Sequence, residues 1–143
     1  METKFILIVD DDKTILEAFK VLLETKKYKI STAENGREAL EKVLNNFYNL
    51  VLLDIKLPDV EGTDLLLEFR QLRPEIKTII VTGYSSRKNA INSLNLGADG
   101  YLEKPVTPGK LLEIVADKLS EQETENRLYE DTVNELLGSK IQA

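Results

Sequence analysis

Apolar and polar residues alternate along the chain in blocks that predict five strands and five helices in strict alternation. Short, nearly continuous apolar runs indicate buried strands, and two more polar runs indicate strands nearer the edge. The expected strands are Phe5–Val9, Tyr28–Thr32, Leu50–Leu53, Ile76–Val81 and Gly100–Leu102. Because strands that alternate with helices are typical of parallel sheets covered on both faces, the pattern predicts an α/β fold with a doubly wound, five-stranded parallel sheet.

The segments between the strands repeat apolar residues at helical spacing. They cover residues 14–25, 35–46, 65–72 and 87–96, and a fifth helix is expected to start at Thr107 and Pro108. Thr14 and Glu17 fit a capping box for the first of these helices. The segment 87–96 is rich in Asn and Ser, which makes it the weakest helical pattern of the five.

The composition shifts after about Ser120, where the chain becomes polar and acidic. We therefore expect a globular domain over residues 1–120, followed over residues 121–143 by a helical extension or a linker to an output domain. A three-four spacing runs on into this segment, at Leu112, Val115, Leu119, Gln122, Asn126, Tyr129, Val133 and Leu136. Two hypotheses stay open: a coiled coil with Asn126 as a buried polar residue, or packing of Val115 and Leu119 on the sheet before a frayed polar linker.

The composition excludes several kinds of chemistry. The 143 residues contain neither cysteine nor histidine, which rules out disulfides, thiolate zinc sites, a histidine base and a phosphohistidine on this chain. A net charge of −6 argues against direct binding of nucleic acid. The apolar runs are too short to span a membrane and the N-terminus has no signal-peptide pattern, so we expect a cytoplasmic location without membrane attachment.

Polar side chains are concentrated at the points where the predicted strands end. The carboxyl ends of parallel strands lie at one edge of the sheet, which is where such folds bind ligands. The residues at these ends are Asp10, Asp11, Asp12, Asp54, Thr82 and Lys104. Several converging carboxylates require a hard divalent cation, and Mg²⁺ takes oxygen ligands together with phosphate. We therefore predict a magnesium-dependent phosphoryl site at this edge.

Four segments, ILIVDDD, VLLDIKLPDVEG, IIVTGY and GADGYLEKP, resemble in order and spacing the receiver domain of two-component response regulators. The resemblance covers Lys4 to about Leu119 and implies a flavodoxin-like sheet of strand order 2-1-3-4-5, as in a chemotaxis regulator of that family. It also implies a phosphorylation-activated signalling switch that is not an enzyme, beyond assisting its own phosphorylation and slow dephosphorylation. A sensor histidine kinase would be the phosphodonor. A homodimer would form through the fourth and fifth elements or through the C-terminal helix.

The resemblance assigns the phosphoacceptor and the metal ligands. Asp54 would attack phosphorus and become an acyl phosphate. Asp10 and Asp11 would bind Mg²⁺ together with Asp54 and the backbone carbonyl of Lys56.

The resemblance further assigns the groups that respond to the phosphoryl group. Lys104 and Thr82 would each contact a phosphoryl oxygen, and Tyr101 would turn inward when Thr82 moves. The Lys104–Pro105 bond would be cis. Asp12 matches no ligand of the family and is expected to cap the first helix.

One different function stays as the alternative. Asp10, Asp12 and Thr14 also fit the D-x-D-x-T pattern of haloacid-dehalogenase-like phosphohydrolases, with Asp10 as the nucleophile and Asp12 as the acid/base. The chain is short for that family, has no cap domain and has no second acidic pair beyond Lys104. This alternative also leaves Asp54 unexplained.

Overall fold

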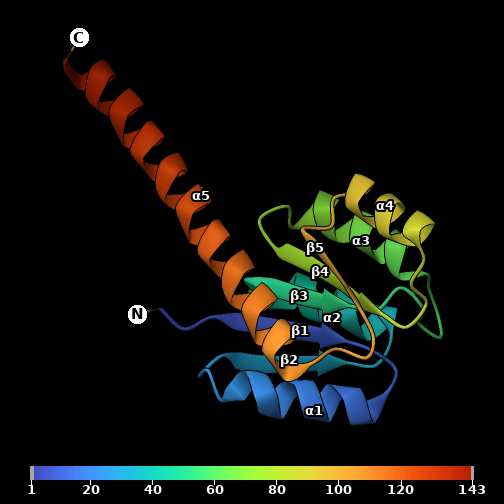
Figure 1. Ribbon diagram of the computed structural model, residues 1–143. Helices are drawn as coiled ribbons and strands as arrows, with labels where there is room; N and C mark the ends of the chain where they lie inside the picture. Colours follow the sequence, from blue (N-terminus) through green and yellow to red (C-terminus); the bar gives the residue numbers. More distant parts are fainter. Residues whose placement is uncertain (1, 143) are drawn as a thin grey trace.

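The computed structural model describes residues 2–142, and their side chains as far as Gly138. These residues form one five-stranded sheet of order β2-β1-β3-β4-β5, in which all neighbours are parallel, with five helices around it (Figure 1). The predicted doubly wound, flavodoxin-like fold with an extended C-terminal helix is confirmed. The elements are β1 (Phe5–Val9), α1 (Lys13–Glu24), β2 (Lys29–Ala33), α2 (Gly36–Asn45), β3 (Leu50–Leu53), α3 (Gly62–Leu72), β4 (Lys77–Thr82), α4 (Arg87–Asn95), β5 (Gly100–Glu103) and α5 (Pro108–Gln142).

The start of α1 differs from the predicted capping box. The Asp12 carboxylate accepts hydrogen bonds from the backbone N–H groups of Thr14 and Ile15, at 2.9 and 3.4 Å, so Asp12 is the N-cap. Thr14 already lies inside the helix, and the capping box at Thr14 and Glu17 is therefore wrong. The expectation that Asp12 caps this helix is confirmed.

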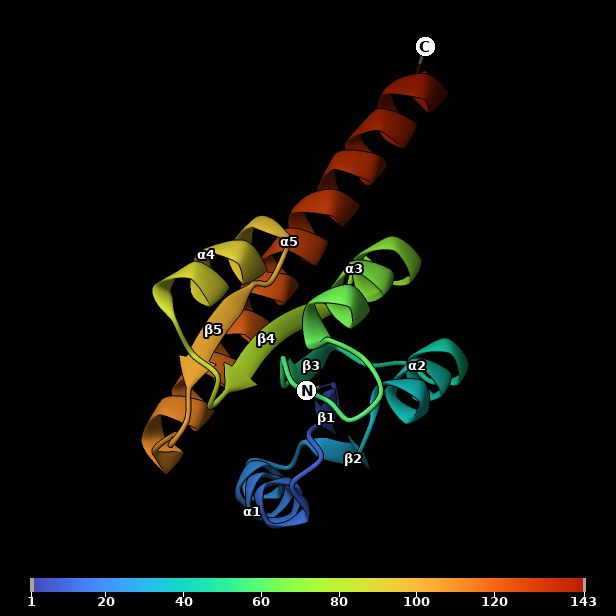
Figure 2. The ribbon, with the colours of Figure 1, turned by 90° about the vertical axis from the view of Figure 1, so that its right-hand side faces the viewer.

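The sheet separates two apolar layers, because alternate residues of a strand face opposite sides. In β1, Leu7 and Val9 pack in the layer under α2 and α3, whereas Ile6 and Ile8 pack in the layer under α1 and α5. Figure 2, turned by 90° from Figure 1, shows α1 on one side of the sheet and α2 and α3 on the other. All four residues of β3 are buried, as expected for a central strand.

Helix α5 stays attached to the sheet beyond the predicted domain end. Val115 and Leu119 pack in the core, as the second hypothesis states. The frayed linker that this hypothesis places after them is wrong, because the helix continues to Gln142. The buried Gln122 donates hydrogen bonds from Nε2 to the backbone carbonyls of Asn49 and Glu75, at 2.8 and 2.9 Å, and accepts one from Asn49 Nδ2 at 3.3 Å. The predicted division between residues 120 and 121 thus falls inside one continuous helix.

Beyond this attachment, α5 runs away from the sheet as a single helix (Figures 1 and 2). Four of its apolar residues there are 52–72% exposed, namely Leu128, Tyr129, Leu136 and Leu137, whereas Val133 is half-buried. None of the helices within residues 2–142 is both long enough and apolar enough to cross a membrane.

Candidate functional site

The pairing of β1 with β3 brings two aspartates together at the carboxyl edge of the sheet. Val9 pairs with Leu53, and the N–H of Asp54 donates to the carbonyl of Val9 at 3.1 Å. Asp10 and Asp54 therefore follow neighbouring strand ends, and the two residues are only 3% and 4% exposed. The exposed Asp11 joins them, so that one carboxylate oxygen from each of the three residues lies within 4.8 Å of the others.

Lys104 joins this acidic cluster, defined as Asp10, Asp11 and Asp54, from the turn after β5. Its backbone N–H donates to the carbonyl of Thr82 at 2.9 Å, and the Lys104–Pro105 bond is cis, as expected. Its Nζ atom lies 2.6 Å from Asp10 Oδ2 and 2.9 Å from Asp54 Oδ2. One ammonium group therefore holds both buried carboxylates.

Burial dominates the electrostatics of the cluster. It raises the pKa of Asp10, helped by the nearby charge of Asp54, although hydrogen bonds from Lys104 and from the Asp12 N–H oppose the increase. Burial alone would lower the pKa of Lys104, but its hydrogen bonds to Asp10 and Asp54 outweigh this and raise it. The ammonium is therefore charged at neutral pH.

The donor set of the cluster fits Mg²⁺. Three carboxylates face a single lysine, so negative charge is left in a largely buried place. Carboxylate oxygens at one point are the ligands of hard divalent cations, and Mg²⁺ is usually held by one or two carboxylates with several waters. Asp10, Asp11 and Asp54 are the residues that could hold it.

The loop from Ile55 to Glu61 closes the site from one side. The N–H of Lys56 donates to Asp54 Oδ1 at 3.2 Å, so the two oxygens of Asp54 are held by Lys56 and Lys104. A backbone bridge joins Lys56 to Glu61, and the N–H of Gly62 donates to the carbonyl of Ile55. This segment, called here the 55–61 loop, is therefore a small hairpin. The ammonium of Lys56 also lies 5.2 Å from the centre of the Tyr84 ring.

Thr82 and Tyr101 occupy the neighbouring strands. Thr82, the last residue of β4, is fully buried, and its Oγ1 accepts a hydrogen bond from the Tyr84 N–H at 3.1 Å. The half-buried Tyr101 donates its hydroxyl to Ser85 Oγ at 3.3 Å. Both predicted switch residues thus form hydrogen bonds to the loop between β4 and α4. Lys104, rather than Thr82 or Tyr101, binds the carboxylates of the acidic cluster.

Two further residues of the site, Asp59 and Gly62, make contacts that were not predicted from the sequence. The Asp59 carboxylate, at the tip of the 55–61 loop, accepts hydrogen bonds from the N–H groups of Gly36 and Arg37 at the start of α2. These two bonds lower the pKa of Asp59. Gly62 lies so close to the backbone carbonyl of Asp54 and to Ile55 Cα that a Cβ atom there would overlap both. The Gly62 contact could be suspected from the glycine alone, whereas the Asp59 contact spans 23 and 22 positions of the chain.

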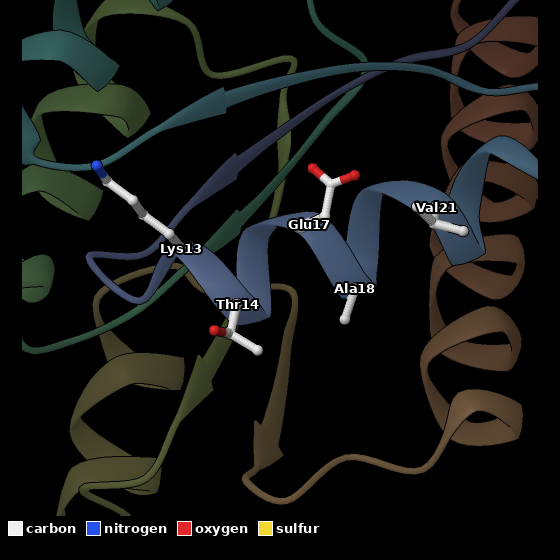
Figure 3. A pocket seen from close by; sticks show the side chains of 5 residues that line it. All are labelled: Lys13, Thr14, Glu17, Ala18 and Val21. Atoms are coloured by element: carbon white, nitrogen blue, oxygen red, sulfur yellow. The ribbon is translucent and has the colours of Figure 1, made fainter.

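A hollow on the outer face of α1 lies beside this site but is separate from it. Figure 3 shows its lining residues, Lys13, Thr14, Glu17, Ala18 and Val21, which all come from one side of the helix. None of the acidic cluster lines it. The chemistry predicted from the sequence therefore belongs to the edge of the sheet.

Comparison with known proteins agrees with this geometry. The family model described as the response regulator receiver domain matches residues 6–116. A transcriptional regulatory protein DltR from Streptococcus agalactiae is 40% identical over 107 residues, which are 75% of this chain and 48% of that protein. A transcriptional regulatory protein ZraR from Klebsiella oxytoca is 38% identical over 130 residues, 91% of this chain and 28% of that protein. The chain thus spans half or less of the length of these relatives.

Solved structures show the same similarity. A CheY-like response regulator receiver domain protein from Methanospirillum hungatei JF-1 superposes with a TM-score of 0.84 at 52% identity, covering 87% of this chain and 99% of that one. A signal receiver domain of a LuxO repressor protein from Vibrio parahaemolyticus gives a TM-score of 0.85 at 30% identity, with 89% and 98% covered. These matches do not favour a haloacid-dehalogenase-like hydrolase. The chain belongs to the response regulator receiver domain family, whose members are signalling domains of two-component systems.

Proposed function

We propose that this chain is a switch that accepts a phosphoryl group from a sensor histidine kinase on Asp54. The observation that carries the proposal is the arrangement of Asp54, which is buried beside Asp10 and held by Lys104. In the transfer, an oxygen of the Asp54 carboxylate forms a bond to phosphorus while the bond from phosphorus to the donor breaks. The donor must be external, since the chain contains no histidine.

Asp10, Asp11 and Asp54 would hold Mg²⁺, with the backbone carbonyl of Lys56 as a further ligand. Bound Mg²⁺ would supply positive charge that polarises the phosphoryl oxygens and neutralises the carboxylates. The Lys104 ammonium would leave its bond to Asp10 and pair with a phosphoryl oxygen. Lys104 already lies within hydrogen-bond distance of Asp54, which supports this role.

Phosphorylation would be read out through Thr82 and Tyr101. The added phosphoryl group brings negative charge and strong acceptor oxygens to the strand ends. Thr82 would turn its hydroxyl toward them and release the N–H of Tyr84. Because Tyr101 is hydrogen-bonded to the same loop at Ser85, a shift of that loop would free Tyr101 to turn inward.

Replacing Asp54 by asparagine is expected to abolish labelling by radioactive acetyl phosphate in the presence of Mg²⁺, because an amide cannot form the acyl phosphate. The matched control is Asp12→Asn, since asparagine also caps helices and Asp12 lies outside the acidic cluster. We expect the control to be labelled like the unmodified protein. Full labelling of Asp54→Asn would contradict the proposal, and loss of labelling in Asp12→Asn would favour the hydrolase alternative, in which Asp12 is the acid/base.

The projecting part of α5 supports a homodimer through this helix. Within the three-four spacing, the residues up to Gln122 pack on the chain's own sheet. The positions left to contact a second copy of the chain are Asn126, Tyr129, Val133 and Leu136. Tyr129→Glu is therefore expected to shift sedimentation toward the monomer, whereas Asn134→Glu, outside the spacing, should leave it unchanged. Equal sedimentation of both variants and the unmodified protein would contradict a dimer through this helix.

A further inference from the structure

The tip of the 55–61 loop is bound to a different element of the fold, helix α2. Asp59 Oδ1 accepts from the Gly36 N–H at 2.8 Å and Asp59 Oδ2 from the Arg37 N–H at 3.0 Å. Val60, the next residue, packs so tightly on Gly36 that a Cβ atom at Gly36 would overlap its side chain. The loop and the start of α2 are therefore in direct contact through two neighbouring loop residues, Asp59 and Val60.

An ordinary helix cap does not account for this contact. Helix α2 already has its own N-cap, Asn35, whose side chain accepts from the Glu38 N–H at 2.8 Å. Asp59 instead satisfies the two N–H groups at the start of the helix that Asn35 does not reach. The loop is thereby connected to α2 by polar bonds that Asn35 cannot provide.

The same loop contacts Asp54 directly. Lys56 and Glu61 are joined by a backbone bridge, so holding the tip at Asp59 also restrains the base of the hairpin. From that base the Lys56 N–H donates to Asp54 Oδ1 at 3.2 Å. A series of contacts thus runs from the start of α2, through the Asp59 side chain and the backbone of the loop, to the carboxylate of Asp54.

We propose that Asp59 is a positioning residue of the phosphoryl site, which holds the loop so that Lys56 presents its backbone to Asp54 and to a metal ion. The part that concerns the metal rests on the proposed function. The part that concerns Asp54 does not, because it depends only on the contacts of the loop with α2 and with Asp54.

The test compares Asp59→Ala with Asn35→Ala, which removes the other cap of the same helix without touching the loop. In the full chain, hydrogen exchange of the Lys56 amide, followed by NMR, is expected to become at least roughly threefold faster in Asp59→Ala and to stay unchanged in Asn35→Ala. Calorimetric titration with Mg²⁺ is expected to give roughly tenfold weaker binding in Asp59→Ala only, the low end of what outer partners of metal ligands contribute. Asp59→Asn should restore part of both, since its amide oxygen still accepts one of the two hydrogen bonds although its NH₂ group cannot accept the other.

Unchanged Lys56 exchange in Asp59→Ala would overturn the inference, as would equal changes in Asp59→Ala and Asn35→Ala, which would indicate general loosening of α2. An Asp59→Asn variant as defective as Asp59→Ala would also contradict it. Failure of the unmodified protein to bind Mg²⁺ would instead count against the proposed function. In that case the hydrogen-exchange rate of the Lys56 amide still shows whether Asp59 positions the loop.

Discussion

Replacing Gly62 by alanine is expected to destabilise the fold by about 3 kcal/mol, the upper part of the range for overpacked sites. The added Cβ atom would overlap the backbone carbonyl of Asp54 and the Cα atom of Ile55. Backbone atoms cannot turn aside as a side chain can, so α3 must shift away from the site or Asp54 must move. Labelling of Asp54 by acetyl phosphate should therefore fall together with the free energy of unfolding in urea.

The chain contains a matched control at Gly109. A Cβ atom there meets no other atom within 4 Å, and the residue lies in the first turn of α5. Gly109→Ala is expected to leave labelling unchanged and to stabilise the protein by up to about 1 kcal/mol, through the higher helix propensity of alanine. If Gly62→Ala were as stable and as well labelled as Gly109→Ala, the close approach of α3 to Asp54 would be wrong.

Replacing Lys104 by methionine is expected to lower the free energy of unfolding by about 3 kcal/mol near neutral pH, the low end for breaking a buried ion pair. The ammonium holds Asp10 and Asp54 at 2.6 and 2.9 Å, and both carboxylates would stay buried without it. Lys110→Met, at an exposed lysine of α5, is the control and should change stability little. Equal stability of the two variants in urea would contradict this account of the cluster.

The defect of Lys104→Met should shrink on acidification. Burial already raises the pKa of Asp10, and loss of the lysine raises it further. A carboxyl group whose pKa is higher in the folded protein reduces stability above that pKa, and the penalty disappears below the pKa of the unfolded chain. The difference in unfolding free energy between Lys104→Met and the unmodified protein is therefore expected to fall between about pH 7 and pH 4. A difference that grows over this range would contradict the argument.

Much of the fold could be predicted because its central strands are apolar on both faces. Phe5–Val9 and Leu50–Leu53 were expected with the bounds that β1 and β3 have. The edge strand β2 is more polar, and there the predicted bounds are one residue early, since apolar Tyr28 precedes the strand. Helix α3 begins at Gly62 rather than Leu65, because its first turn lacks the apolar spacing that predicted the rest.

The acidic cluster was predictable for a different reason. Parallel strands place their carboxyl ends at one edge, so polar residues that follow apolar runs must gather there. Contacts between loops and helices follow no such rule. The bonds of Asp59 to Gly36 and Arg37, and those of Gln122 to Asn49 and Glu75, join residues whose sequence patterns are independent of each other.

The most direct test of the account is to identify the residue that carries the phosphoryl group. After incubation of the protein with acetyl phosphate and Mg²⁺, borohydride reduces an aspartyl phosphate to homoserine, which peptide mass spectrometry locates in the chain. The account predicts homoserine at residue 54, and none at residue 10, 11 or 12. Homoserine at residue 10, the nucleophile of the hydrolase alternative, would contradict it.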